Sequence, residues 1–207
     1  MNLQNVITPL FIGVLLCVGF ILLDDDVRAS QYSEALSSYQ RAIKTYDSSS
    51  IKNAISHFDA IIASDPTDGR ALVYKGSLLS ALAKASWMPW DKLGYVNKGI
   101  DLMDQGITMV STKNTDSHTE IEVRMVRGIT SAKIPSAFRR GQVAEADFKM
   151  IREHPNFSKM SADDKCAVFA YSAVLAGRAG EINKADLFLR EAQTFNGALA
   201  NTIWSQK

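Results

Sequence analysis

The sequence predicts an all-α protein, a solenoid of about four helical hairpins preceded by one N-terminal transmembrane helix. Three observations predict this class. From residue 31 onward the apolar residues follow helical spacing, with no sustained alternation of the strand type. Short breaks divide this region into paired segments, and the pairs recur about every 34 to 40 residues, a period typical of helical repeats. Ahead of them lies an uncharged apolar stretch, residues 6–23.

Composition and charge place the chain among ordinary globular proteins. Of its 207 residues, 46% are hydrophobic and 22% are charged, enough to bury a core. The formal net charge is only +1, and no dense basic run appears. We therefore expect no nucleic-acid partner.

The apolar stretch VITPLFIGVLLCVGFILL, residues 6–23, predicts a membrane anchor. A helix of this length comes close to the ~30 Å thickness of the hydrocarbon core, and the stretch ends at three aspartates. We expect residues 1–29 to form an N-terminal membrane anchor or uncleaved signal segment in contact with the lipid bilayer. Residues 30–207 then form the helical repeat domain.

A cleaved signal peptide is the alternative, with Val27 and Ala29 preceding a cut before Ser30. Three features disfavour cleavage. The apolar region is longer than the usual ~7–15 residues, the segment before it has no Lys or Arg, and aspartates crowd the proposed site. A lipoprotein anchor at Cys17 is disfavoured by the bulky Leu16 before it.

The orientation of the anchor has two interpretations. The positively charged residues Arg28, Arg41 and Lys44 follow the span, which under the positive-inside rule favours a cytoplasmic body. Large translocated domains often escape that rule, and these charges are few. We expect a single-pass protein of the bacterial inner membrane with its repeat domain in the periplasm.

The segment AGRAGEINKADLFLREA, near the C-terminus, resembles the second half of a tetratricopeptide repeat. That motif places a glycine in the turn between paired helices and then spaces two alanines around a large apolar residue. The corresponding residues here are Gly180, Ala185, Leu189 and Ala192. The glycine permits a backbone conformation that few residues adopt, and the alanines permit close helix packing.

Other segments extend the resemblance over most of residues 31–196. AISHFDAIIASDP supplies Ala54, Phe58 and the helix-ending Pro66, with Ile61 in place of the second alanine. ALVYKGSLL and VRMVRGITSA resemble the first helix of a unit. The predicted units are residues 31–66, 69–111, 119–155 and 162–196, followed by a short terminal helix over 198–206. The whole resembles membrane-anchored bacterial repeat proteins, which implies binding rather than chemistry.

The two middle units are longer than the repeat requires. The second unit has about eleven extra residues, which we interpret as a loop around KASWMPWDKLG. Trp87 and Trp90 in this segment either form a binding hot spot or pack back over the adjacent hairpin. In the third unit Arg139 and Arg140, within FRRGQ, either meet an anionic partner or cap helix carbonyl groups.

The family resemblance also implies where a partner binds, because the first helix of each unit lines the concave face. Tyrosines at those positions offer amphipathic contact area, although each of them has packing between units as its alternative. The Lys and Asn pattern by which some of these repeats bind a peptide C-terminus is absent. The predicted partner-binding residues are Tyr39, Tyr74, Tyr171, Arg70, Arg178, Trp87, Trp90 and Arg139.

Catalytic patterns are absent from the sequence. His57, His118 and His154 form no metal-binding pair, and there is no phosphate-binding glycine loop and no Gly-x-Ser-x-Gly elbow. Cys166 lies on an apolar helical face, where a buried inert thiol is expected. We predict no enzyme, no cofactor and no metal.

The predicted function is therefore that of a membrane-tethered protein–protein interaction scaffold or adaptor, a subunit or assembly factor of an envelope complex. Its partner is expected to be another membrane or periplasmic protein or a second copy of the chain. The alternatives are a substrate-capturing subunit of a transport or secretion system and, more remotely, a small enzyme.

Overall fold

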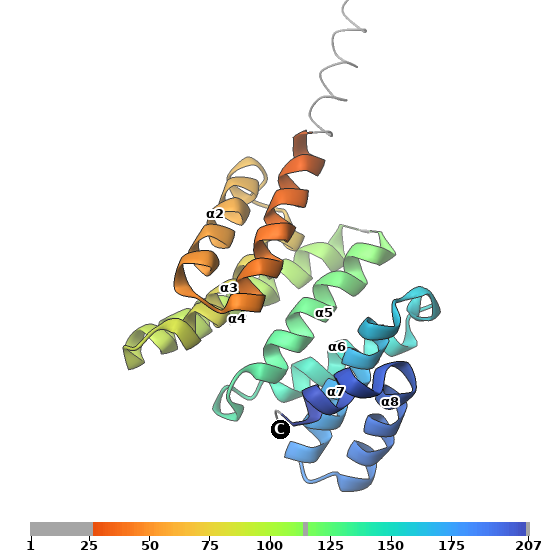
Figure 1. The fold of residues 1–207 in the computed structure, drawn as a ribbon. Coiled ribbons are helices and arrows are strands. Elements are labelled where there is room, and N and C mark those ends of the chain that lie inside the picture. The colour runs from red at the N-terminus through yellow and green to blue at the C-terminus, as the bar shows by residue number, and fades with distance from the viewer. Residues whose placement is uncertain (1–26, 114–115, 206–207) are drawn as a thin grey trace, which may run out of the picture.

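The computed structural model describes residues 27–113 and 116–205, and every regular element within these ranges is helical. This confirms the predicted all-α class (Figure 1). The chain begins with a helix over residues 27–45. It is followed by α2 (Ser48–Ser64), α3 (Gly69–Ala85), α4 (Pro89–Thr112), α5 (Ser117–Lys133), the short 3-10 helix η1 (Ser136–Phe138), α6 (Gly141–Glu153), the 3-10 helix η2 (Phe157–Lys159), α7 (Ala162–Arg178) and α8 (Ile182–Trp204).

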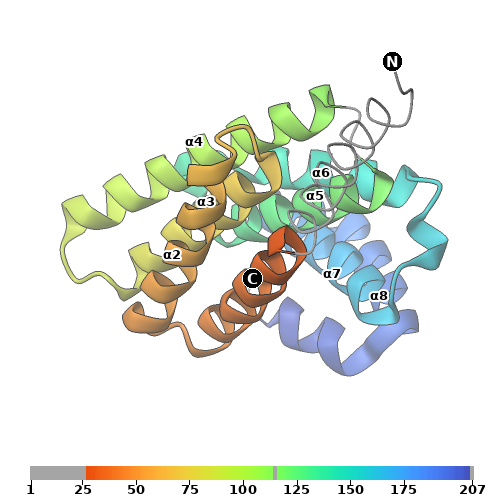
Figure 2. The same cartoon turned by 90° about the horizontal axis from the view of Figure 1, so that it is seen from above.

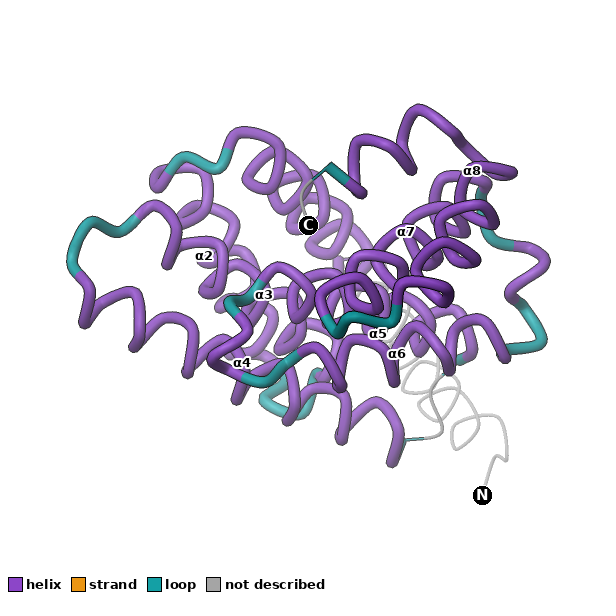
Figure 3. Tube along the Cα trace, turned by 90° about the horizontal axis from the view of Figure 1, so that it is seen from below, coloured by secondary structure: helices purple, strands orange, loops and turns teal. Residues whose placement is uncertain are grey.

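The helices are arranged as consecutive hairpins, in the manner of a helical repeat. We call the first helix of each hairpin a first helix and the other a second helix. The first helices pack in series: the helix of residues 27–45 shares a core with α3, α3 contacts α5, and α5 contacts α7. The second helices α2, α4 and α6 each contact the first helix of the next hairpin. Figures 2 and 3 show this succession from above and below, with short loops between long helices.

Side-chain caps determine where several helices begin. Asp47, Asp68 and Asp116 each accept hydrogen bonds from backbone N–H groups in the first turn of α2, α3 and α5. Ser161 does the same for α7, with its Oγ 3.1 Å from the backbone nitrogen of Asp164. Each cap satisfies donors that have no partner within the helix.

The turn between α7 and α8 confirms the packing that the repeat pattern predicted. Gly180 has a φ of +80°, in the left-handed region. Ala185 and Ala192 are buried at 2% and 0% exposure, and Leu189 is half-buried against the same core. The predicted contact of small residues between paired helices therefore exists in this hairpin.

The predicted loop in the second unit is wrong. Only residues 86–88 separate α3 from α4, and the extra residues lengthen α4 by forming its first turns. Pro89 begins that helix, where its fixed φ suits the first turn and its missing N–H costs nothing. The third unit does contain a longer connection, which holds η1.

α3 and α4 approach each other through facing glycines. A Cβ added at Gly69 would lie 2.4 Å from the carbonyl oxygen of Gly106, and one added at Gly76 would lie 2.5 Å from that of Gly99. These distances are below van der Waals contact, so the seam between the two backbones requires residues without side chains.

The short terminal helix expected over residues 198–206 is present as the part of α8 that follows a bend. α8 continues to Trp204 but bends at Asn196, whose φ of −156° and ψ of 98° are not helical. The Asn196 side chain accepts a hydrogen bond from the Leu199 N–H at 3.0 Å and so restarts the helix. The Trp204 ring then lies over Gly177, where an added Cβ would be 3.2 Å from it.

The predicted anchor, residues 6–23, lies outside the described residues. Among the helices between residues 27 and 205 that the structure describes, none is long and apolar enough to cross a membrane. The anchor and the predicted localisation therefore stay predictions.

Candidate binding surface

Two hollows lie side by side at the C-terminal ends of the first helices. We call the first the apolar pocket; it is bounded by the ends of the helix of residues 27–45, α3 and α5 and by the start of α4. We call the second the polar groove; it is bounded by the ends of α5 and α7 and the starts of α6 and α8. Ile134 lines both.

The apolar pocket has a volume of about 330 Å³. This is within the range of pockets that hold small ligands. Its wall contains mainly aliphatic, aromatic and proline side chains, with no carboxylate and no side-chain amide. The charged groups in its wall are all cationic: Lys84, Lys92 and Lys133. The pocket is thus both apolar and positively charged.

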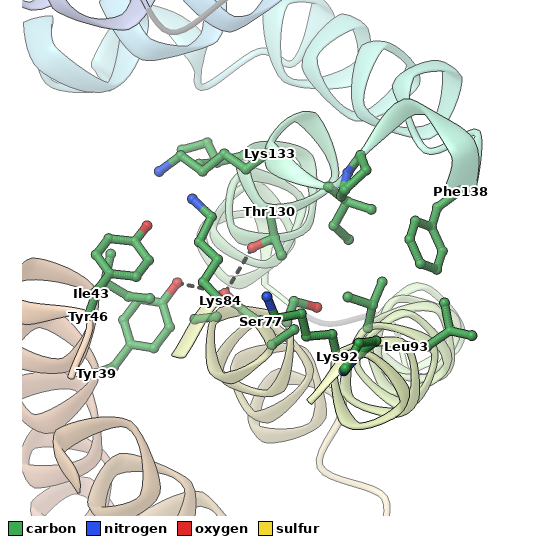
Figure 4. Close-up of a pocket in the computed structure, with 18 residues that line it drawn as sticks. Tyr39, Ile43, Tyr46, Ser77, Lys84, Lys92, Leu93, Thr130, Lys133 and Phe138 are labelled. Atoms are coloured by element: carbon green, nitrogen blue, oxygen red, sulfur yellow. Dashed lines mark hydrogen bonds between the residues drawn. The ribbon is translucent and has the colours of Figure 1, made fainter. Parts of the chain in front are cut away.

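Two of these cations gather at one end of the pocket beside Tyr46 (Figure 4). The Lys84 Nζ lies 5.3 Å from the centroid of the Tyr46 ring, and the Lys133 Nζ lies 5.6 Å from that of Tyr171. Burial lowers the pKa of Lys133, but the hydroxyls of Tyr171 and Tyr46 together raise it by more than burial lowers it. The pKa therefore lies above its ordinary value. Lys133 is therefore charged at neutral pH.

Tyr46 itself has a φ of 54°, in a region that a non-glycine residue adopts only at a cost. It follows the helix of residues 27–45 and precedes the cap Asp47, so the chain turns into α2 at this residue, which lines the pocket. The ring of Tyr46 is half-buried, and the Lys84 ammonium group lies over it.

A chain of hydroxyl groups crosses the pocket and joins three first helices. The Tyr39 Oη lies 3.0 Å from the Ser77 Oγ, and the latter lies 2.8 Å from the Thr130 Oγ1. These residues come from the helix of residues 27–45, α3 and α5 in turn. The pocket's main hydroxyl groups are thus bonded to one another (Figure 4).

The polar groove is larger, about 700 Å³, and carries both signs of charge. Arg139, Arg178 and Lys184 supply positive groups, and Glu145 and Glu181 supply negative ones. One oxygen of Glu145 accepts a hydrogen bond from Arg152 at 2.8 Å.

Two buried polar atoms in the wall of the polar groove have no hydrogen-bond partner among the residues that the structure describes. They are the second carboxylate oxygen of Glu145 and the Oγ of Ser131. Such atoms are uncommon in folded proteins, because leaving them unpaired costs about 1–3 kcal/mol each.

The three predicted tyrosines differ in their surroundings. Tyr39 is half-buried and lines the apolar pocket. Tyr74 is 6% exposed, stacks on Phe58 with ring centroids 5.1 Å apart, and donates its hydroxyl hydrogen to Glu122. Tyr171 is 7% exposed and stacks on Phe148. The burial of Tyr74 and Tyr171 favours the packing alternative for these two.

The predicted arginines also have structural contacts. Arg70 pairs with Glu122, with an Nη2–Oε1 distance of 2.8 Å, and lies over the ring of Tyr32. Arg178 donates a hydrogen bond to the Ala132 carbonyl at 2.6 Å, across the polar groove. Arg139 is exposed, with a left-handed φ of 54°.

Trp87 and Trp90 project from the turn before α4 and from its first turn. Their exposed fractions are 84% and 66%, so neither ring packs back over the hairpin. The packing alternative is wrong for both. The structure thus brings Arg139 and Arg178 to one groove, places Tyr39 in the neighbouring pocket, and leaves the two tryptophans on an exposed turn.

Sequence reasoning missed the lysines of the apolar pocket. A signal for them exists: α3, α5 and α7 each carry a basic residue in the last turn, namely Lys84, Lys133 and Arg178. A cation near a helix C-terminus is usually explained by its favourable interaction with the helix dipole. For this reason the sequence alone does not single out these three residues as a binding site.

Comparison with known proteins gives no further assignment. Neither the sequence nor the fold matches a family model, a curated protein or a solved structure. In the part of the chain that the structure describes, no group of three His, Cys, Asp or Glu side chains is placed to hold a metal ion.

Proposed function

We propose that this protein is a tetratricopeptide-like interaction module, tethered to a bacterial inner membrane by residues 6–23 with its repeat domain in the periplasm. In this proposal it is a scaffold or adaptor of an envelope complex, and a segment of a partner protein binds in the polar groove. Support for the tether comes from the uncharged apolar stretch that ends at three aspartates.

One observation carries the choice of the polar groove. Its wall holds two buried polar atoms without partners, on Ser131 and Glu145. A peptide segment carries N–H groups along its whole length, and such a donor satisfies either oxygen once the side chain that carries it turns toward the groove. The charges of both signs around the groove, with Arg139 and Arg178 on its wall, suit a polar protein segment better than a uniformly apolar one.

A photo-crosslinking residue tests this site directly. Benzoylphenylalanine replaces Gln142, which is exposed in the wall of the polar groove, in the full chain expressed in a Gram-negative bacterium. The matched control places it at Lys149, which is exposed on the same helix but outside the groove. We expect an adduct of one defined mass from position 142 only, which mass spectrometry then identifies as a protein.

The contrary outcomes are equally clear. Adducts of equal yield from both positions would show that contacts at the groove are not specific. No adduct from position 142, while the unmodified chain still co-purifies with a partner, would place the binding surface elsewhere and direct the search to Trp87 and Trp90.

The tether has its own test in the intact mass of the natively expressed chain. A mass that includes residues 1–29, in the membrane fraction, supports the anchor. A mature chain that begins at Ser30 would refute it without affecting the groove.

A further inference from the structure

Two of the three cations of the apolar pocket gather at one of its ends, and the third, Lys92, lies beside Leu93 on α4. At one end stand the ammonium groups of Lys84 and Lys133, and at the other the side chains of Leu93 and Phe138 (Figure 4). Val96 and Ile134 are buried hydrophobic side chains of its wall. A ligand that fits must therefore carry negative charge at one end and apolar surface along the rest.

The cationic end lacks the partners that lysines elsewhere in the fold have. Lys75 pairs with Asp59, and Lys184 pairs with Glu181. Among the described residues, no carboxylate lies within ion-pair distance of Lys84, Lys92 or Lys133. Two cations held around one strained tyrosine, with no anion beside them, form a site with uncompensated charge.

The rest of the pocket is poorly suited to an extended peptide. Peptide N–H and C=O groups require hydrogen-bond partners when they are buried, and each unpaired group costs free energy. The pocket wall has no amide and no carboxylate side chain, and Tyr39, Ser77 and Thr130 already bond one another. An alkyl chain makes no such demand, and its transfer from water to this wall is favourable.

We propose that the apolar pocket binds a single-chain anionic amphiphile, namely a long-chain carboxylate, whose head group lies between Lys84 and Lys133. Its chain runs along Val96 and Ile134 toward Phe138. The site is separate from the polar groove and goes beyond the interaction function proposed above. The apolar pocket is, in this proposal, the site of a small-molecule ligand.

The test uses the full chain in phosphatidylcholine nanodiscs and a defined probe. The probe is dodecanoate that carries a diazirine in its chain and an alkyne for detection, and the matched neutral probe is the corresponding alcohol. After irradiation, tandem mass spectrometry locates the labelled residues and gives the labelled fraction at each probe concentration. We expect labels on the walls of the pocket, competed by unlabelled dodecanoate and not by dodecanol.

Variants test the cationic end. Replacing both lysines, in K84Q/K133Q, removes two charge-assisted contacts, so we expect the half-saturating probe concentration to rise by about tenfold or more. The control K44Q/K52Q removes the same net charge from exposed lysines outside the pocket and should label as the wild type does. Circular dichroism verifies that each variant is folded.

Three outcomes would overturn the proposal. Equal labelling by the alcohol would show that the pocket accepts apolar chains without a negative head. Unchanged half-saturation in folded K84Q/K133Q would remove the role of the lysines. Labels confined to residues outside the pocket would place the ligand elsewhere. The comparison of the two probes on the wild-type chain decides the question even if the double variant does not fold, and none of these results depends on an adduct at Gln142.

Discussion

Replacing Gly76 with alanine tests the seam between α3 and α4. The new Cβ would lie 2.5 Å from the Gly99 carbonyl oxygen and 2.7 Å from the Met103 Cγ. The methionine side chain can move, but the carbonyl belongs to the facing helix backbone. The two helices must therefore separate, which also loosens the second close contact, between Gly69 and Gly106.

The expected magnitude is the difference between two opposing effects. Alanine is favoured over glycine inside a helix by about 1 kcal/mol. Overpacking in a rigid contact costs about 3 kcal/mol at the upper end of its usual range, which applies because backbone meets backbone here. The net loss of folding stability is then about 2 kcal/mol, or about 4–8 °C in melting temperature for a domain of this size.

Gly94 provides the matched control on α4. A Cβ added there would meet nothing within 4 Å, so Gly94→Ala should gain the helical preference without a clash. Thermal unfolding of the two full-chain variants, followed by circular dichroism, should therefore show shifts of opposite sign. If Gly76→Ala raises the melting temperature as Gly94→Ala does, the close approach of α3 and α4 is not real.

Three further changes probe the packing, the charges and the caps. Ala185→Leu should lower the free energy of unfolding by about 1–3 kcal/mol in chemical denaturation, since its methyl group is buried between α7 and α8, and an unchanged value would contradict that packing. Asp147→Asn should cost about 3 kcal/mol by the same measurement, because two arginine side chains of α5 lose a fully buried carboxylate; a loss below 1 kcal/mol would show that they find other partners. Hydrogen bonds from Thr119 to Asp116 and from Thr67 to Asp65 lower the pKa of each aspartate. The two ionised aspartates therefore contribute their full stabilisation of the fold above the ordinary aspartate pKa of about 4. Stability in an acid titration should fall as the pH drops below that value, and the D116N/D65N variant should show a shallower fall.

Much of the fold follows from local patterns that the sequence displays. The spacing of apolar residues predicted the helices, and Gly180, Ala185 and Ala192 predicted one hairpin contact in detail. The second unit was misread, because a proline between two tryptophans indicates a loop as readily as a helix start. The start at Pro89 depends on the packing of the long α4 against α3, which local sequence does not reveal.

The binding surface was less predictable than the fold. Tyr74 has the expected position on a first helix, but the stacking of Phe58 and the carboxylate of Glu122 draw it into the core. Both partners come from other helices. The pairing of Lys84 with Lys133 likewise depends on how α3 and α5 lie side by side. Sequence spacing shows which residues share a face but not which faces meet.

The hydroxyl chain across the apolar pocket has two possible directions. In each of its two hydrogen bonds either oxygen is able to donate, so the Ser77 hydroxyl can point toward Tyr39 or toward Thr130. Three hydroxyl hydrogens serve two bonds, so when both bonds run in the same direction one hydrogen is left free at one end of the chain or the other. A group that accepts a hydrogen bond at Tyr39 selects one direction, and a group that donates there selects the reverse. Reversal rotates all three hydroxyls together, so a local contact at the first helix changes the dipole presented by α5 without moving the backbone.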